Sequence, residues 1–159
     1  MRFIMSLNRC YFFKILIIKI FLLLVLHSTY SFGETSVIKG PYEVFYSVFN
    51  SSFISPETAK LIGFKRAKNT ALINISIRKN ISETVSIEKK ASSLIASAYN
   101  LIHKKPLEFT EIIEPGAIYY LSEFKISNDN EKMIISAEVI PEGSQDPINI
   151  SFQHHFYIN

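Results

Sequence analysis

Apolar and polar residues alternate along three segments of the chain, and this alternation predicts β-strands. The segments are TALINISIR (70–78), KMIISAEVI (132–140) and INISFQHHFYI (148–158). Because successive side chains of a strand point to opposite faces, each segment has one apolar face. The predicted core faces carry Ala71, Ile73, Ile75 and Ile77; Met133, Ile135, Ala137 and Val139; and Ile148, Ile150, Phe152, Phe156 and Ile158.

Three further segments are strand-like because they are rich in aromatic and β-branched residues. They are YEVFYSVF (42–49), LEFTEII (107–113) and AIYYLSEFKI (117–126), and VSIEKKAS (85–92) is a weaker seventh candidate. Seven short strands at regular spacing favour an all-β fold, an immunoglobulin-like antiparallel β-sandwich.

Turn residues separate the later strands. The sequence EPG (114–116) places proline and glycine as a type II turn requires, and NDN (128–130) and PEGS (141–144) are further turn signals. The C-terminal half therefore predicts a meander of four antiparallel strands, at 107–113, 117–126, 132–140 and 147–158. No linker or repeat interrupts it, so a single domain is expected.

One short helix is predicted near residues 56–62, within the segment FNSSFISPETAKLIGFKRAKN (49–69). Ser55 is a favourable N-cap, Pro56 suits the first helical position, and Gly63 is a typical C-terminal stop. We expect this helix to cross between the two sheets. Its predicted anchors are Phe53, Leu61 and Phe64, since so short a helix needs tertiary packing.

The N-terminus predicts an exported protein. Residues 1–14 are basic, Ile15–Leu26 is apolar except for Lys19, and small and polar residues follow, which is the pattern of a secretory signal peptide. We expect residues 1–31 to be the signal peptide and residues 32–159 the single β-sandwich domain, with cleavage after Ser31 or, alternatively, after Gly33. The alternative is an uncleaved signal that anchors the protein to the inner membrane, although a spanning helix needs about 20 apolar residues.

Removal of the signal peptide changes the charge of the protein. The whole chain has 17 Lys and Arg and 14 Asp and Glu. Four of the basic residues precede residue 32, which leaves 17 − 4 = 13 basic against 14 acidic residues in the domain. A net charge near −1 does not favour nucleic acid as a partner. The single cysteine, Cys10, is removed as well, so no disulfide is expected.

A set of short motifs gives the chain a family resemblance. The motifs are a Tyr-Glu-Val strand, Phe-Asn-Ser, a Pro-Glu-x-Ala helix start, a glycine before an Arg-x-Lys-Asn turn, and an Ala-Leu-x-Asn-Ile strand. The residues that carry them are Tyr42, Glu43 and Val44; Phe49, Asn50 and Ser51; Pro56, Glu57 and Ala59; Gly63; Arg66, Lys68 and Asn69; and Ala71, Leu72, Asn74 and Ile75. The later segments Leu107–Phe109, Ala117–Tyr120, Phe152-Gln153 and Phe156-Tyr157 extend the similarity.

The chain thereby resembles the family of exported Gram-negative proteins known as domain of unknown function 4426. The resemblance implies a periplasmic location and a fold, and it implies no chemistry. Two features depart from the family pattern, the pair His154 and His155 and the segment SLIASAYNLIHKK (93–105).

Few residues are suited to catalysis or to metal binding. A Ser-His-Asp triad needs a buried carboxylate behind its histidine, yet Asp129 and Asp146 both lie in predicted turns. No Gly-x-Ser-x-Gly motif is present. Neighbouring strand residues point to opposite faces, so His154 and His155 cannot share one metal ion, and His154 is expected on the core side. We expect no cofactor and no metal site, and whether the protein is an enzyme stays open, with a non-enzyme favoured.

The sharpest charge cluster consists of Lys65, Arg66 and Lys68, with Asn69 beside it. One interpretation is a solvated loop in which Arg66 and Asn69 order the turn from within. The other is a binding contact for an acidic envelope partner. The favoured function is a non-catalytic binding or accessory module of the cell envelope that uses sheet faces or edges to bind an envelope protein. The alternative is an envelope hydrolase or a small-ligand-binding protein with a loop-borne site. Neither the partner's identity nor the oligomeric state follows from the sequence.

Overall fold

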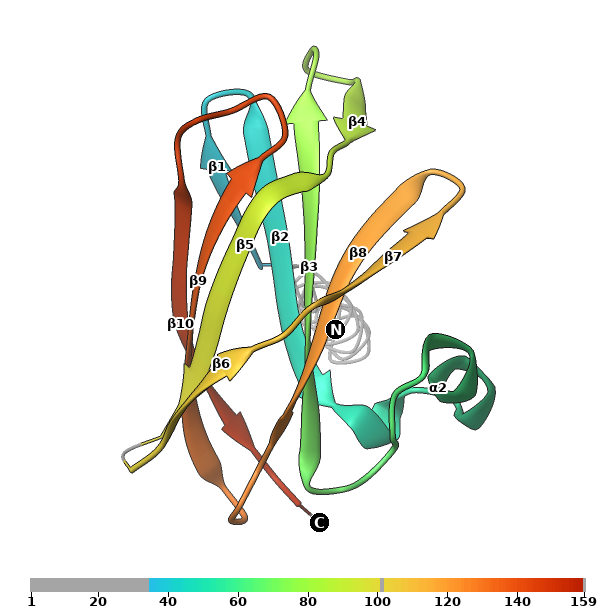
Figure 1. Cartoon of the computed structure of the whole chain (residues 1–159), viewed down its shortest axis with the longest axis vertical. Coiled ribbons are helices and arrows are strands. Elements are labelled where there is room, and N and C mark those ends of the chain that lie inside the picture. The colour runs from blue at the N-terminus through green and yellow to red at the C-terminus, as the bar shows by residue number, and fades with distance from the viewer. Residues whose placement is uncertain (1–34, 101, 159) are drawn as a thin grey trace, which may run out of the picture. The chain divides into compact units, whose positions relative to one another are not determined.

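The computed structural model describes residues 35–100 and 102–158, which form two antiparallel β-sheets packed as a sandwich (Figure 1). The predicted signal peptide and both predicted cleavage sites lie outside the described residues. The described residues lie within one compact unit. The all-β sandwich expected from the sequence is confirmed.

Sheet A has six strands and sheet B has four. Sheet A has the order β1-β2-β3-β8-β7, with β4 paired to β3 beside this path; sheet B has the order β10-β9-β5-β6. The strands of sheet A are β1 (Thr35–Lys39), β2 (Tyr42–Asn50), β3 (Thr70–Asn80), β4 (Ser86–Glu88), β7 (Thr110–Glu114) and β8 (Ala117–Lys125). Those of sheet B are β5 (Ala91–Tyr99), β6 (Lys104–Leu107), β9 (Glu131–Pro141) and β10 (Ile148–Phe156), and the helices are η1 (Ser51–Phe53) and α2 (Pro56–Ile62).

The core lies between the sheets and is built from the faces that alternation predicts. Ile73, Ile75 and Ile77 of β3 are completely buried, and so are Ile135 and Val139 of β9. Aromatic side chains join the layers: the rings of Tyr46 and Phe152 lie 4.7 Å apart, and those of Phe124 and Phe156 lie 5.6 Å apart in an edge-to-face arrangement. Such pairs add to the free energy gained by burying apolar area.

Ten strands are described where about seven were expected. Segments 85–92 and 107–113 each fall on two strands, and residues 35–39 form a further strand, β1. The most consequential omission is most of β5, residues 93–99, because this strand pairs with both β9 and β6 inside sheet B. It was missed because residues 91–99 contain many serines and alanines, which are weak strand formers outside a packed sheet.

The predicted four-stranded meander is wrong. Strands β7 and β8 pair in sheet A and strands β9 and β10 pair in sheet B, but β8 and β9 do not pair with each other. The segment after β8 instead passes from one sheet to the other. The turn residues at 128–130 are present, with Asn130 at a positive φ of 53°. A turn signal alone therefore does not show whether the strands before and after it pair with each other.

The helix forms where predicted, but it does not cross between sheets. Ser55 accepts a hydrogen bond from the Thr58 backbone N–H, and Gly63 ends the helix in the left-handed conformation. The helix lies in the connection between β2 and β3, which are neighbours in sheet A. Two of its predicted anchors are wrong, since Phe53 and Leu61 are 80% and 83% exposed, and the small side chain of Ala59 is the buried one.

Candidate functional site

The connection between β2 and β3, residues 51–69, is closed by two buried polar side chains. Asn50 donates through Nδ2 to the Lys68 carbonyl and accepts at Oδ1 from the Ser52 N–H. Ser51 Oγ donates to the Ala67 carbonyl and accepts from the Ala67 N–H, both at 2.9 Å. The Phe-Asn-Ser motif therefore joins the two ends of the connection, because its side chains satisfy backbone groups that strand pairing leaves free.

The predicted binding residues all lie on the second half of this connection, and all four are exposed. Arg66 donates from Nη2 to the Ser52 carbonyl at 2.8 Å, so its guanidinium holds the connection together from within. Asn69 uses its backbone carbonyl to accept from the Ile126 N–H at 3.0 Å. A binding role for Lys65, Arg66, Lys68 and Asn69 stays a prediction.

Lys65 lines a polar groove of about 630 Å³ beside the helix. Glu108 and Glu123 also line this polar groove, together with the hydroxyl side chains Thr110 and Ser122. The lysine and both glutamates are exposed. Charged groups of both signs lie here in contact with water, which screens their interaction.

A second hollow, of about 440 Å³, lies on the outer face of sheet A next to the β2–β3 connection. We call it the apolar hollow; it is lined by Phe49, Phe53, Ile54, Thr58, Ile62, Asn74, Ile112, Glu114, Tyr119 and Leu121. Its walls come from β2, η1, α2, β3, β7 and β8, and seven of these ten residues are apolar or aromatic. A predominantly apolar lining with a few polar groups is typical of small-ligand sites.

Asn74 is the unusual residue of the apolar hollow. It lies on the central strand β3, opposite Ser47 of β2 and Leu121 of β8. Its side-chain oxygen Oδ1 is buried and has no hydrogen-bond partner among the described residues. Since buried acceptors in folded proteins are almost always paired, this oxygen needs an explanation.

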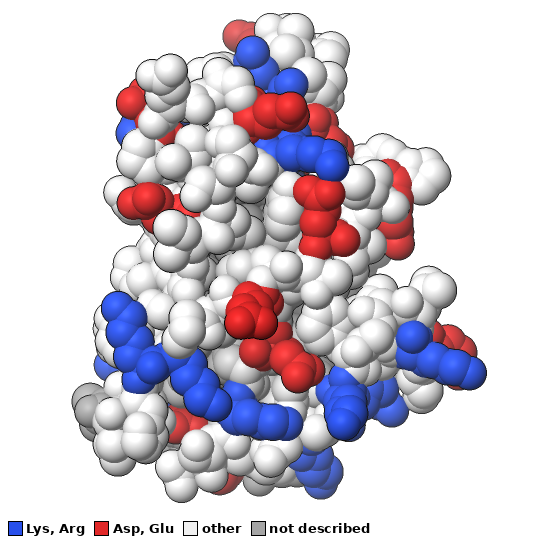
Figure 2. Space-filling model, viewed as in Figure 1, with Lys and Arg blue, Asp and Glu red and all other residues white. Residues whose placement is uncertain are grey.

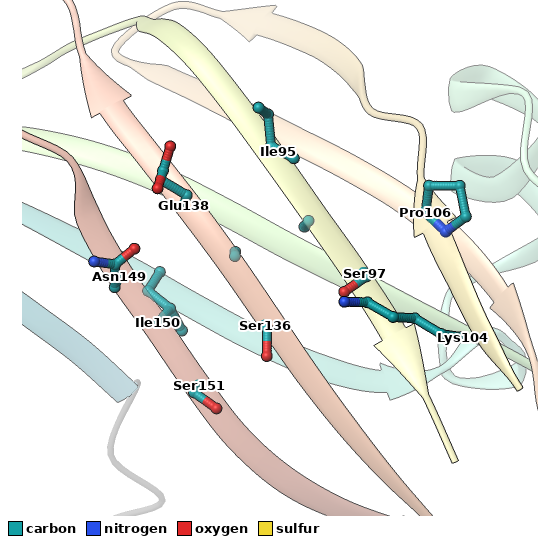
Figure 3. Close-up of a pocket in the computed structure, with 11 residues that line it drawn as sticks. Ile95, Ser97, Lys104, Pro106, Ser136, Glu138, Asn149, Ile150 and Ser151 are labelled. Atoms are coloured by element: carbon teal, nitrogen blue, oxygen red, sulfur yellow. The ribbon is translucent and has the colours of Figure 1, made fainter. Parts of the chain in front are cut away.

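A third hollow lies on the outer face of sheet B, where Ser97, Ser136 and Ser151 form a row across β5, β9 and β10 (Figure 3). Lys104 extends beside Ser97 in this view, and its ammonium lies 5.9 Å from the centre of the Tyr99 ring. Figure 2 shows basic side chains gathered across the lower part of the visible face, below a group of acidic ones. Charge is therefore unevenly distributed on this face.

The two histidines of β10 point to opposite sides of the sheet, as alternation predicts. The ring of His154 lies 4.5 Å from that of Phe156, and burial lowers the pKa of His154, with a further contribution from the nearby His155. His155 is exposed and its Nδ1 lies 3.1 Å from Asn130 Oδ1. Within the described residues, no group of three or more His, Cys, Asp or Glu side chains is placed to hold a metal ion.

A hydrogen-bonded link between the sheets was not predicted from the sequence. The Tyr120 hydroxyl on β8 donates to Glu111 on β7 at 2.7 Å and accepts from the Ala91 N–H on β5 at 2.9 Å. Lys90 forms an ion pair with the same glutamate at 2.8 Å. Burial raises the pKa of Tyr120 to about 12, and the neighbouring Glu111 adds to that shift. This cluster joins the two layers and lies apart from the apolar hollow.

The fold and these surfaces define a class of protein, an all-β sandwich with open hollows on its surface, two of which lie on the outer faces of its sheets. The chain belongs to the DUF4426 family, described as a domain of unknown function, whose model matches residues 37–159. The family resemblance inferred from the sequence is thus confirmed.

One solved structure shows the same fold, the crystal structure of a DUF4426 family protein from Pseudomonas aeruginosa. It is 32% identical to this chain, with a TM-score of 0.64, and the match covers 80% of this chain and 98% of that one. No curated protein matches. In the described part of this chain, no helix combines the length and the apolar character needed to cross a membrane.

Proposed function

We propose that this protein is a non-catalytic binding or accessory module of the cell envelope, which acts in the periplasm after removal of its signal peptide. The observation that carries the proposal is the apolar hollow on sheet A. There, Phe49, Ile62 and Leu121 line a space open to solvent instead of packing in the core. Apolar surface kept open in this way is a common mark of a binding site.

The location is supported by the N-terminal pattern of basic, apolar and small residues, which favours export. The domain that follows has no cysteine, so it does not depend on the redox state of its compartment. An uncleaved signal that anchors the domain to the inner membrane is the alternative, and it leaves the same binding surfaces on the same side of that membrane.

A binding role is favoured over catalysis by the contents of the hollows. Glu114 and Tyr119 are the ionisable residues that line the apolar hollow, and they supply no nucleophile and base in contact. In the polar groove, Lys65 and the two glutamates are exposed to water. General acid–base catalysis is more effective where water is excluded and pKa values are tuned.

The exposed Lys65 and Lys68 offer a separate contact for an acidic envelope protein. Strand β10 is an edge strand of sheet B with nine residues, so a partner's strand can add to it. We assign the accessory role, contact with an envelope protein, to the two lysines and the β10 edge. We assign the binding role to the apolar hollow.

Native mass spectrometry tests the binding role. The protein is purified from the periplasmic fraction, and Leu121→Trp, which fills the apolar hollow, is compared with Ile95→Trp, a matched substitution at an exposed position of sheet B. We expect a bound molecule on the wild-type protein and on Ile95→Trp, and none on Leu121→Trp. Equal loading of all three proteins, or none on any, would contradict the proposal.

A further inference from the structure

The unpaired Asn74 oxygen indicates which ligands suit the apolar hollow. Resting on the proposed binding role, we propose that the apolar hollow binds a small apolar amine, neutral or protonated, whose N–H donates a hydrogen bond to Asn74 Oδ1. Three features of the hollow carry this inference: its buried acceptor, its charge and its apolar walls.

The buried acceptor selects for a donor. Asn74 lines the hollow, and its side-chain oxygen Oδ1 is buried and has no partner among the described residues. A wholly apolar ligand would leave this oxygen as it is in the free protein, without a partner. A ligand that presents an N–H at this point satisfies it, and satisfying a buried acceptor changes affinity by about 5- to 100-fold.

The charge of the hollow selects against anions. Glu114, at the end of β7, is the one acidic residue that lines the hollow, and no Lys, Arg or His lines it. A carboxylate or sulfonate in the hollow would lie near this glutamate and near an amide oxygen, which are both acceptors. An amine is favoured in the same place, because its N–H groups are donors and any positive charge on it is attracted to Glu114.

The walls of the hollow select for an apolar body. About 440 Å³ is enough for a ligand of one to three rings. Phe53 lines the hollow and is nevertheless 80% exposed, so a bound apolar body would cover a ring that otherwise faces water. Burial of that ring adds favourable free energy to binding.

Three fluorescent probes of one shape separate these features. N-phenyl-1-naphthylamine has an apolar body and one N–H. Its N-methyl derivative lacks the donor, and 1-anilinonaphthalene-8-sulfonate keeps the donor but is an anion. The protein is expressed as the full chain and purified in the processed form that the cell yields, and the dissociation constants are measured by fluorescence titration.

We expect wild-type protein to bind the neutral N–H probe about tenfold more tightly than either of the other two probes. In Asn74→Leu the preference for the N–H probe over its N-methyl derivative should fall to within about twofold, because the acceptor is gone. The control Asn149→Leu, on the exposed face of sheet B, should keep the wild-type preference.

Asn74→Leu also separates a binding role from a structural one. A leucine there removes an unpaired polar group from an apolar site, so the ligand-free variant should melt at the wild-type temperature or above it. A lower melting temperature would contradict the inference, because it would show that Asn74 stabilises the fold.

The remaining outcomes distinguish the two proposals. If the N–H and N-methyl probes bind equally to wild-type protein and both are lost in Leu121→Trp, the hollow binds ligands and the inference about the donor is wrong. If no probe binds, or if binding is unaffected in Leu121→Trp, the proposed binding role is contradicted together with the inference.

Discussion

At the scale of single residues, buried polar side chains determine how the loops of this sandwich close. Glu131 is 7% exposed and accepts hydrogen bonds from Asn100 Nδ2 and from the backbone N–H groups of Ser127 and Asn128. One carboxylate thereby joins the turn before β9 to the end of β5. Burial by itself would raise the pKa of Glu131, but these three hydrogen bonds together lower it below the ordinary value.

Replacement of Glu131 by glutamine should destabilise the protein. Glutamine has one acceptor oxygen, so its NH₂ group would face either the Asn100 amide or the two backbone donors. We expect Glu131→Gln to lower the free energy of unfolding at pH 7 by about 1–3 kcal/mol, as measured by urea denaturation.

The effect of Glu131 should depend on pH with a definite sign. A carboxylate with a lowered folded-state pKa stabilises the protein above its unfolded-state value, and this contribution is lost as the pH falls through the folded-state value. The difference between wild type and Glu131→Gln should therefore shrink below about pH 4.5, the ordinary value. A constant difference from pH 7 to pH 3 would contradict this assignment.

Tyr120 should give the opposite pH dependence. Its folded-state pKa of about 12 lies above the ordinary value of 10.0, so its protonated form stabilises the fold and that contribution is lost between pH 10 and pH 12. Thermal melts over this range should show wild-type protein losing more stability than Tyr120→Phe. At pH 7 the variant should be less stable by about 1 kcal/mol, since the Ala91 N–H loses its acceptor. If the melting temperatures of the two proteins fall equally between pH 10 and pH 12, the stabilising role of the Tyr120 hydrogen bonds is contradicted.

At the scale of elements, the connection between β2 and β3 contains a capped short helix and also forms one wall of the apolar hollow. Its cap, proline and glycine were readable in the sequence because helix capping depends on neighbouring residues alone. Its packing was not readable: Phe53 and Leu61 were expected to anchor the helix and are exposed. The helix places its small Ala59 inward, and Phe53 is left to line the hollow.

Arg66 is predicted to stabilise this connection. Arg66→Ala should lower the melting temperature by a few degrees, because the Ser52 carbonyl loses a charge-assisted hydrogen bond. The matched control is Lys65→Ala, at the neighbouring exposed position, which should melt like wild type. An unchanged melting temperature in Arg66→Ala, with loss of an envelope partner in crosslinking, would favour recognition over stabilisation.

At the scale of the whole molecule, two sheets enclose the core and each presents an outer face with a hollow. The outer face of sheet A could have been suspected from the sequence, because Leu72 and Leu121 are apolar residues at positions that alternation assigns to the polar side. Charge was the criterion for the predicted contact residues, Lys65, Arg66, Lys68 and their neighbour Asn69. A cluster of charged residues gives no indication of where an apolar hollow lies. The site favoured here thus shares no lining residue with the predicted one.

The compartment is tested on the whole protein by its mature N-terminus. We expect protein from a periplasmic extract to begin at Phe32 or Glu34, because cleavage follows the small residues at the end of the apolar segment. N-terminal sequencing or intact mass measurement checks this. An N-terminus at Met1 in the membrane fraction would show instead that the signal is retained.

The sequence by itself determined which segments form most of the strands, which faces of β3, β9 and β10 meet the core, and where α2 begins and ends. These features follow from period-two alternation and capping, which act between residues a few positions apart. Only the tertiary structure decided that β8 and β9 belong to different sheets and that β2 and β3 are neighbours, since alternation permits either pairing. It also decided that Asn74, one polar residue among several in its strand, lines an apolar hollow with its Oδ1 unpaired, because the side chains around it come from five other elements.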